Sequence, residues 1–84
     1  MTVNKNVVCG PHRDKRNSSE SYIAFFGDYE SGGSLHLEDG RVFPGSEKGV
    51  WHGPFDGAKV THYNSPHRGG TKWSCVAYSQ TPPR

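Results

Sequence analysis

The chain has little of what membrane or secreted proteins are built from. Only 31% of its 84 residues are hydrophobic, and no apolar run reaches the roughly 20 residues that a membrane-spanning helix needs. Two cysteines, Cys9 and Cys75, are too few for a disulfide framework, and neither belongs to a Cys-x-x-Cys pair. The first twenty residues lack the apolar core of a signal peptide. We therefore expect a soluble intracellular protein, nuclear or cytoplasmic, with buried free thiols and no membrane partner.

The composition also disfavours long helices. Eleven glycines and six prolines divide the chain into pieces that are too short for them. A chain of this length fills one domain and buries only about 60% of the surface that its unfolded form exposes, so its stability is marginal. We predict a single all-β domain over residues 1–84, in which residues 80–84 form a flexible tail.

Short apolar or alternating segments predict six to eight antiparallel strands, a pattern typical of a sandwich or jelly roll. Ser21–Phe26 is the most apolar segment and is expected to be buried on both faces. Asp39-Gly40 predicts a two-residue hairpin turn, and Ala58–Tyr63 predicts a strand with His62 on its inward face. The other expected strands cover residues 3–9, 34–38, 41–43, 50–52 and 71–79, with turns or loops at 27–33, 44–49, 54–57 and 64–70.

Charge gives little information about a partner. Ten Lys and Arg against eight Asp and Glu leave a net charge of +2, whereas a dedicated nucleic-acid-binding protein usually shows a stronger basic stripe. The one local cluster consists of Arg13, Lys15 and Arg16. On charge alone, a solvated loop is the favoured interpretation. The cluster is of interest because it flanks His12 and Asp14.

His12 and Asp14 are the first two candidate metal ligands. Residues two apart in an extended segment point to the same side, so both side chains can face one metal ion. His62 follows His12 by fifty residues. Two imidazoles and one carboxylate, with the other coordination positions open, form the facial triad of non-haem Fe(II) oxygenases. Each residue also has a simpler interpretation: a polar, ion-paired loop for His12 and Asp14, and a hydrogen-bonded core histidine for His62.

Lys72 and Ser74 are candidates for holding the co-substrate of such an oxygenase. Lys72 follows His62 by ten residues and lies on the next predicted strand, where an inward ammonium could pair with the far carboxylate of a 2-oxo acid. Ser74 shares this face and could donate a hydrogen bond beside it. If the strand is turned over, Trp73 and Cys75 lie inside instead and Lys72 is a surface lysine.

These elements, in this order, resemble the Fe(II)/2-oxoglutarate-dependent dioxygenases, whose fold is a double-stranded β-helix, a jelly-roll, cupin-like core. Within that superfamily the sequence is most similar to the TET/JBP group (ten-eleven translocation and J-binding protein oxygenases), which modify 5-methylpyrimidines in DNA. His12 to Asn17 looks like that group's His-x-Asp-x-x-Asn, and Lys72-Trp73-Ser74 looks like its Arg-x-Ser. Gly32–Leu35 and Phe55–Gly57 are similar to strand and turn phrases of these cores.

The resemblance implies that His12, Asp14 and His62 bind Fe(II) and that Lys72 with Ser74 holds 2-oxoglutarate. The implied activity is hydroxylation of a substrate C–H bond, with 2-oxoglutarate and dioxygen as co-substrates.

The resemblance also implies DNA as a possible partner. Asn17 would face a substrate base that leaves its stack to reach the iron, and the basic cluster with Arg13 would hold phosphates. Two features depart from the family pattern: Lys72 stands in place of the usual arginine, and the sequence begins eleven residues before His12, without the N-terminal helices and strands that normally support the sheet.

Two other functions stay open. One is a dioxygenase that acts on a protein side chain or a small molecule, because prolyl-hydroxylase-like members use lysine as the cation. The other is a non-catalytic β-sandwich binding module, or a truncated and inactive oxygenase core. The sequence leaves the primary substrate and the oligomeric state undetermined.

Overall fold

The computed structural model describes residues 2–6, 10–13 and 17–80, and for residues 2, 17–19 and 78–80 it describes the backbone only. These residues form nine β-strands and no helix, so the predicted all-β class is confirmed. No helix that could cross a membrane is therefore present among them. Gln80, expected in a tail, is the last residue of the final strand, while residues 7–9 and 81–84 lie outside the described residues.

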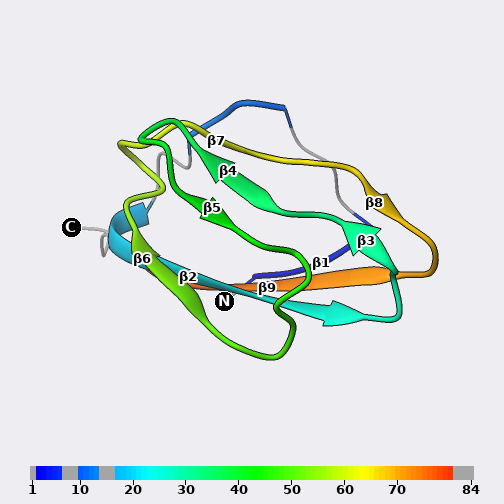
Figure 1. The fold of residues 1–84 in the computed structure, drawn as a ribbon. Helices are drawn as coiled ribbons and strands as arrows, with labels where there is room; N and C mark the ends of the chain where they lie inside the picture. The colour runs from blue at the N-terminus through cyan, green and yellow to red at the C-terminus, as the bar shows by residue number, and fades with distance from the viewer. Residues whose placement is uncertain (1, 7–9, 14–16, 81–84) are drawn as a thin grey trace.

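The larger sheet has four antiparallel strands in the order β1-β9-β2-β6. Its two central strands, β2 (Asn17–Gly27) and β9 (Lys72–Gln80), pair over nearly their whole length and form the longest ladder of the fold. Two shorter strands, β1 (Thr2–Lys5) and β6 (His52–Phe55), pair with β9 and β2 at the edges. Figure 1 shows this sheet as one of two layers.

The second layer is built around a hairpin of β4 (Leu35–Leu37) and β5 (Val42–Phe43). The position of the predicted hairpin turn at Asp39-Gly40 is confirmed: Gly40 has a φ of 96°, which favours glycine, and its N–H donates to the Leu37 carbonyl at 3.0 Å. Its predicted length of two residues was wrong, because the Leu37 N–H donates to the Arg41 carbonyl at 2.9 Å and leaves a loop of three residues, 38–40. The strand β7 (His62–Asn64) pairs with the other edge of β4, which gives the sheet order β5-β4-β7.

Two further contacts extend this layer. A short ladder of β3 (Ser31–Gly32) and β8 (His67–Arg68) continues from the β4 and β7 ends at one side of the molecule (Figure 1). On the free edge of β7, His12 forms an isolated antiparallel bridge with His62. The segment around His12 is thus the fourth member of the second layer.

The hydrophobic core lies between the two layers. Its buried members come from both sheets and from the connection between them: Ile23, Phe25, Tyr29, Leu35, Leu37 and Phe55. On β2, Ile23 and Phe25 point inward, whereas Tyr22 and Phe26 are 36% and 45% exposed. The prediction that Ser21–Phe26 is buried on both faces was therefore wrong at Tyr22 and Phe26, because an antiparallel sheet in a two-layer fold can leave one face to solvent. Ala24, between them on the outer face, is 1% exposed.

Several boundaries also differ from the prediction. Pro54 and Phe55, expected in a turn, belong to β6, whereas residues 58–61, expected in a strand, precede β7 and lie outside any strand. The expected turn at 27–33 and the expected loop at 64–70 contain β3 and β8. Cys75, expected to be buried, is a free cysteine that is only partly buried. These short segments become strands because a distant segment pairs with them, which local propensity does not encode.

Candidate functional site

His12 and His62 lie side by side. In the bridge between them, each backbone N–H donates to the carbonyl of the other residue at 3.0 Å. Their ring centroids are 4.4 Å apart and their planes are inclined by 59°. His62 is only 4% exposed and pairs with Leu37, a core residue of β4. The backbone bridge therefore fixes two imidazoles next to each other at the edge of the core.

Each of the two rings is oriented by the backbone two residues before it. His12 Nδ1 lies 2.8 Å from the Gly10 carbonyl oxygen, and His62 Nδ1 lies 2.9 Å from the Val60 carbonyl oxygen. Because a carbonyl oxygen only accepts, each neutral ring carries its proton on Nδ1 and its lone pair on Nε2. A backbone carbonyl that fixes the tautomer in this way is the usual support of a metal-binding histidine. The pair thus presents two nitrogen donors that suit a divalent transition metal.

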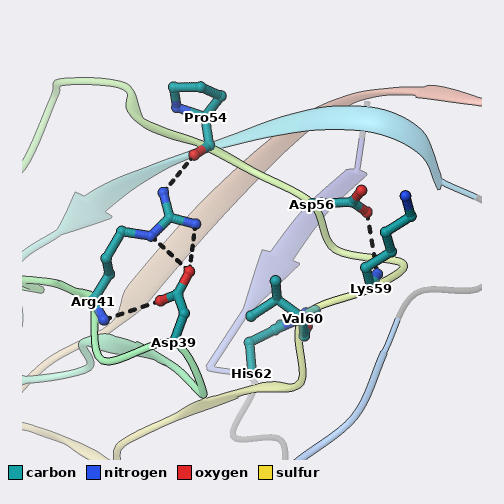
Figure 2. Close-up of polar contacts among 7 residues, drawn as sticks. All are labelled: Asp39, Arg41, Pro54, Asp56, Lys59, Val60 and His62. Carbon is teal, nitrogen blue, oxygen red and sulfur yellow. Dashed lines mark hydrogen bonds and ion pairs between the residues drawn. The ribbon is translucent and has the colours of Figure 1, made fainter.

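The turn before β7 sets the position of the Val60 carbonyl. Asp56 Oδ1 accepts hydrogen bonds from the N–H groups of Ala58 and Lys59 at 3.0 and 3.1 Å, and the Asp56 carbonyl accepts one from Val60 at 2.9 Å. Figure 2 shows this turn leading through Val60 to His62. An aspartate that caps its own turn is a common local device. Asp56 therefore supports the His62 ring indirectly.

A second polar cluster closes the β4–β5 hairpin against β6 (Figure 2). Arg41 contacts Asp39 Oδ2 through Nη2 at 2.9 Å and through Nε at 3.0 Å, and it donates from Nη1 to the Pro54 carbonyl at 2.7 Å. The side-chain and backbone hydrogen bonds from Arg41 lower the pKa of the Asp39 carboxyl. Both side chains are exposed, so we assign this cluster a structural role.

Arg13, a predicted substrate residue, is exposed beside the histidine pair. Its Nε donates to Thr61 Oγ1 at 3.1 Å. Thr61 directly precedes His62 and Arg13 directly follows His12, so this hydrogen bond joins the two histidine-bearing segments in addition to the backbone bridge.

Two predicted site residues fall wholly or partly outside the described structure. Asp14, the predicted third ligand, is not among the described residues, and Asn17, the predicted base-facing residue, is described by its backbone at the start of β2. Within the described ranges, no group of three His, Cys, Asp or Glu side chains is arranged to hold a metal. The described part of the site is the pair of histidines.

Lys72 and Ser74 lie on the inner face of β9, and Trp73 between them faces outward. Lys72 and Ser74 are 2% and 7% exposed, whereas Trp73 is 41% exposed. The alternative in which this strand is turned over is thereby excluded. Lys72 Nζ lies 5.0 Å from the centre of the Phe25 ring. Buried lysines are rare because burying a charge is costly.

Gly33 provides the space for Lys72. A Cβ at Gly33, where φ is 72°, would lie 3.0 Å from Lys72 Cδ, 3.1 Å from Cε and 3.3 Å from Nζ. Gly33 is followed on the same inward side by Leu35 and Leu37, and Leu37 pairs with His62. The stretch from Gly33, which contacts Lys72, to Leu37, which pairs with His62, therefore connects the surroundings of these two residues.

Sequence reasoning missed Tyr29 and Lys48. Tyr29 is buried, its hydroxyl donates to the Gly45 carbonyl, and burial raises its pKa. Lys48 Nζ lies 4.0 Å from the centre of the Tyr29 ring and donates to the carbonyls of Gly27 and Tyr29 at 2.9 and 2.7 Å. The one available signal was a large aromatic residue in an otherwise polar, glycine-rich segment.

The other three histidines contact different parts of the fold. His36 stacks on Tyr63 on the outer side of the β5-β4-β7 sheet, with ring centroids 4.7 Å apart and ring planes inclined by 8°. His52 Nε2 lies 2.9 Å from the Glu47 carbonyl oxygen. His67 packs with its ring centroid 5.9 Å from that of Tyr29.

Comparison of the chain with protein-family models, with curated proteins and with solved structures found no match. The chemistry of the site is therefore inferred from its own side chains alone.

Proposed function

We propose that the chain is the core of a Fe(II)- and 2-oxoglutarate-dependent dioxygenase that hydroxylates a substrate C–H bond. The observation that carries this proposal is the contact between His12 and His62, with 4.4 Å between ring centroids and each Nδ1 bonded to a backbone carbonyl. A core histidine satisfied by hydrogen bonding does not account for a second imidazole of the same tautomer directly across the bridge.

The pattern of strand pairing supports a double-stranded β-helix for this core. Such a fold is a long hairpin that is wound up, so partners across the hairpin should lie at similar distances before and after one turn, while neighbouring windings would account for other pairs such as β2–β9 and β4–β7. Taking Asp39 as that turn, Leu35 and Phe43 lie four residues to either side, and Val3 and Cys75 lie thirty-six residues to either side. The bridge between His12 and His62, twenty-seven residues before and twenty-three after, belongs to the same series.

The donor set fits Fe(II). The Nε2 atoms of His12 and His62 would hold the metal, and the Asp14 carboxylate is the proposed third ligand, since Fe(II) oxygenases use two imidazoles and one carboxylate. When bound, iron with 2-oxoglutarate activates dioxygen, and 2-oxoglutarate is oxidised to succinate and carbon dioxide as the substrate is hydroxylated. The chain's own contribution is to orient the two rings through the carbonyls of Gly10 and Val60.

Lys72 and Ser74 would hold the far carboxylate of 2-oxoglutarate. A buried ammonium and a neighbouring buried hydroxyl on the same face of β9 provide a charge-assisted and a neutral hydrogen bond. Phe55, whose ring centroid lies 5.6 Å from that of His62, and Phe25 beside Lys72 line the same interior. These apolar walls would keep bulk water away from the reacting groups.

For the substrate we propose a 5-methylpyrimidine base in DNA. The support is the exposed guanidinium of Arg13, which is tethered to Thr61 beside the histidine pair and is suited to a phosphate. Asn17 would contact the extruded base. A protein side chain or a small molecule is the second candidate substrate, because Lys72 in place of arginine is the choice of the prolyl-hydroxylase-like branch.

The test is an anaerobic titration of the chain with Fe(II) and 2-oxoglutarate, followed by the visible charge-transfer band of the chelate. We expect a band in the wild type, its loss in His62→Ala, and its retention in His36→Ala, a matched control on the outer side of the adjacent strand. Lys72→Ala should keep Fe(II) binding and weaken 2-oxoglutarate binding.

The substrate class is tested by succinate release. Stimulation by DNA that contains 5-methylcytosine, but not by unmethylated DNA or by proline-containing peptides, would support the base-modifying activity. No charge-transfer band from a folded wild-type chain would refute the oxygenase proposal, and metal binding without succinate release under any condition would identify an inactive core.

A further inference from the structure

The outer face of the larger sheet carries an apolar patch. On the outer face of β1, β9 and β2 the apolar residues lie next to one another through the strand register, and we call them the outer patch: Val3, Tyr22, Ala24, Phe26, Trp73, Cys75 and Ala77. Ala24, the small residue at the centre, is only 1% exposed, and Cys75 and Ala77 are partly buried. Trp73, Phe26 and Val3 are 41%, 45% and 62% exposed, and Trp73 lies directly opposite Phe26. Adjacent exposed aromatic residues on a sheet face mark an interaction surface.

Two opposite charges lie at opposite ends of the outer patch. At one end Lys5 pairs with Trp73, and its Nζ lies 5.4 Å from the centre of the indole ring. At the other end the Glu20 carboxylate lies 3.5 Å from the Tyr22 hydroxyl. Glu20 and Phe26 are six residues apart on the same side of β2, so the two charged ends are separated by about 20 Å along the strands.

We propose that the outer patch is the contact surface between two copies of this chain, related by a two-fold axis. An isologous interface must be complementary to itself. A two-fold axis that lies in the interface, passes through the centre of the outer patch and is perpendicular to the line from Lys5 to Glu20 exchanges its two ends. Lys5 of each copy then lies beside the partner's Glu20, and the bulky Trp73 end of each copy covers the partner's Ala77 end.

The charge pattern favours a second copy over a nucleic acid. A platform for single-stranded nucleic acid combines stacking aromatic residues with a positively charged groove. On the outer patch, the positive charge of Lys5 is balanced by Glu20, which would repel a phosphate chain. An apolar centre with charged groups at its rim is the usual composition of a protein interface.

The size of the outer patch limits the affinity. It spans three strands spaced by about 4.8 Å and extends for about 20 Å along them, which is smaller than the roughly 800 Å² per partner of a standard interface. We therefore expect a reversible dimer whose population rises with protein concentration across the micromolar range.

Sedimentation equilibrium across the micromolar to submillimolar range tests this proposal with a charge swap. Lys5→Glu and Glu20→Lys should each weaken dimerisation by about tenfold, since each creates two like-charge contacts per dimer, and the double variant should recover to within about threefold of the wild type. Glu38→Lys, which makes the same charge change at an exposed residue next to β4, should leave the dimer unchanged. Trp73→Ser should abolish dimerisation independently of the charges.

A chain that stays monomeric at every concentration would overturn the proposal, and so would a dimer that neither single charge reversal weakens. Quenching of tryptophan fluorescence by a single-stranded oligonucleotide, lost in Lys5→Glu and not recovered in the double variant, would instead assign the outer patch to nucleic acid. Circular dichroism of each variant confirms that the fold is retained, which is expected because Lys5 and Glu20 are exposed. This proposal is independent of the metal site, so Fe(II) binding should be the same in all these variants.

Discussion

Replacing Gly33 by alanine tests whether the buried Lys72 side chain needs the space that a glycine leaves at this position. The new alanine would have to adopt a φ near 72°, and its Cβ would lie 3.0 to 3.3 Å from three atoms of the Lys72 side chain. The left-handed backbone conformation costs about 1–2 kcal/mol for a residue with a Cβ, and overpacking a buried side chain costs about 1–3 kcal/mol more. We expect Gly33→Ala to lower the free energy of unfolding by roughly 2–5 kcal/mol, a large share of a total of roughly 4–13 kcal/mol for a chain of this length.

Gly49 supplies the matched control for this experiment. Its φ is 75°, nearly that of Gly33, but a Cβ at Gly49 meets no atom within 4 Å. Gly49→Ala should therefore show only the backbone penalty of about 1–2 kcal/mol. Urea unfolding followed by tryptophan fluorescence measures both, and in a Lys72→Ala background the difference between the two glycine variants should disappear. Equal losses for Gly33→Ala and Gly49→Ala in the wild-type background would refute the assigned role of Gly33.

Three polar contacts give further tests. Asp56→Ala should lower the free energy of unfolding by about 1 kcal/mol and weaken Fe(II) binding measured by calorimetry. Asp56→Asn, which keeps the side-chain oxygen acceptor, should do neither. An unchanged metal affinity of the alanine variant would contradict the proposed support of His62 by Asp56. Tyr29→Phe should lower stability by about 1 kcal/mol at neutral pH. Burial raises the pKa of Tyr29, so its contribution to stability is fully present below its ordinary pKa of about 10 and is lost as the pH rises above that value. In urea unfolding at alkaline pH, the stability of the wild type should therefore decline more steeply with pH than that of Tyr29→Phe. Parallel declines would disprove this. Arg41→Ala should raise the pKa of Asp39 to its ordinary value in an NMR titration. Since Arg41 lowers that pKa, the contribution of the Asp39–Arg41 contact to stability is present above about pH 3.9 and is lost as the pH falls through the lower folded value. An unaltered titration of Asp39 in the variant would exclude Arg41 as the cause.

The features that the sequence predicts correctly are those that depend on local chemistry. The turn at Asp39-Gly40 is one, because a short hairpin loop with a positive φ needs glycine or a similar residue wherever it occurs, although the loop proved to have three residues instead of two. The orientation of Lys72 and Ser74 is another, because strict alternation along a strand assigns both to one face. Motif spacing also selected His12 and His62, which the structure brings into contact.

The features that sequence reasoning missed depend on partners far away in the chain. Tyr29 is buried because Lys48 and Gly45 come from a loop sixteen or more residues away. Tyr22 and Phe26 face outward because the core lies on one side of β2 only, and an apolar strand looks the same in sequence whether one or both of its faces are covered. The local pattern therefore defines which segments can be strands, and long-range pairing decides which of them are.

One long-range relation could nevertheless be anticipated. In the proposed wound hairpin, partners across the hairpin lie at similar distances before and after the turn, to within the shifts that bulges introduce. The pairs β2–β9 and β4–β7 do not follow this rule, because they would join neighbouring windings. With the turn at Asp39, the partner of His12 should lie about twenty-seven residues beyond it, and the observed partner His62 lies twenty-three beyond it. A register shift does occur between the pairs on either side of Tyr22, where Ser21 is opposite Phe55 and Ile23 is opposite His52, and such irregularities account for differences of a few residues. If the proposed winding is right, the separation between the two histidines follows from the winding of the chain around the turn at Asp39, and two residues from the first quarter and the last third of the sequence then meet in one site.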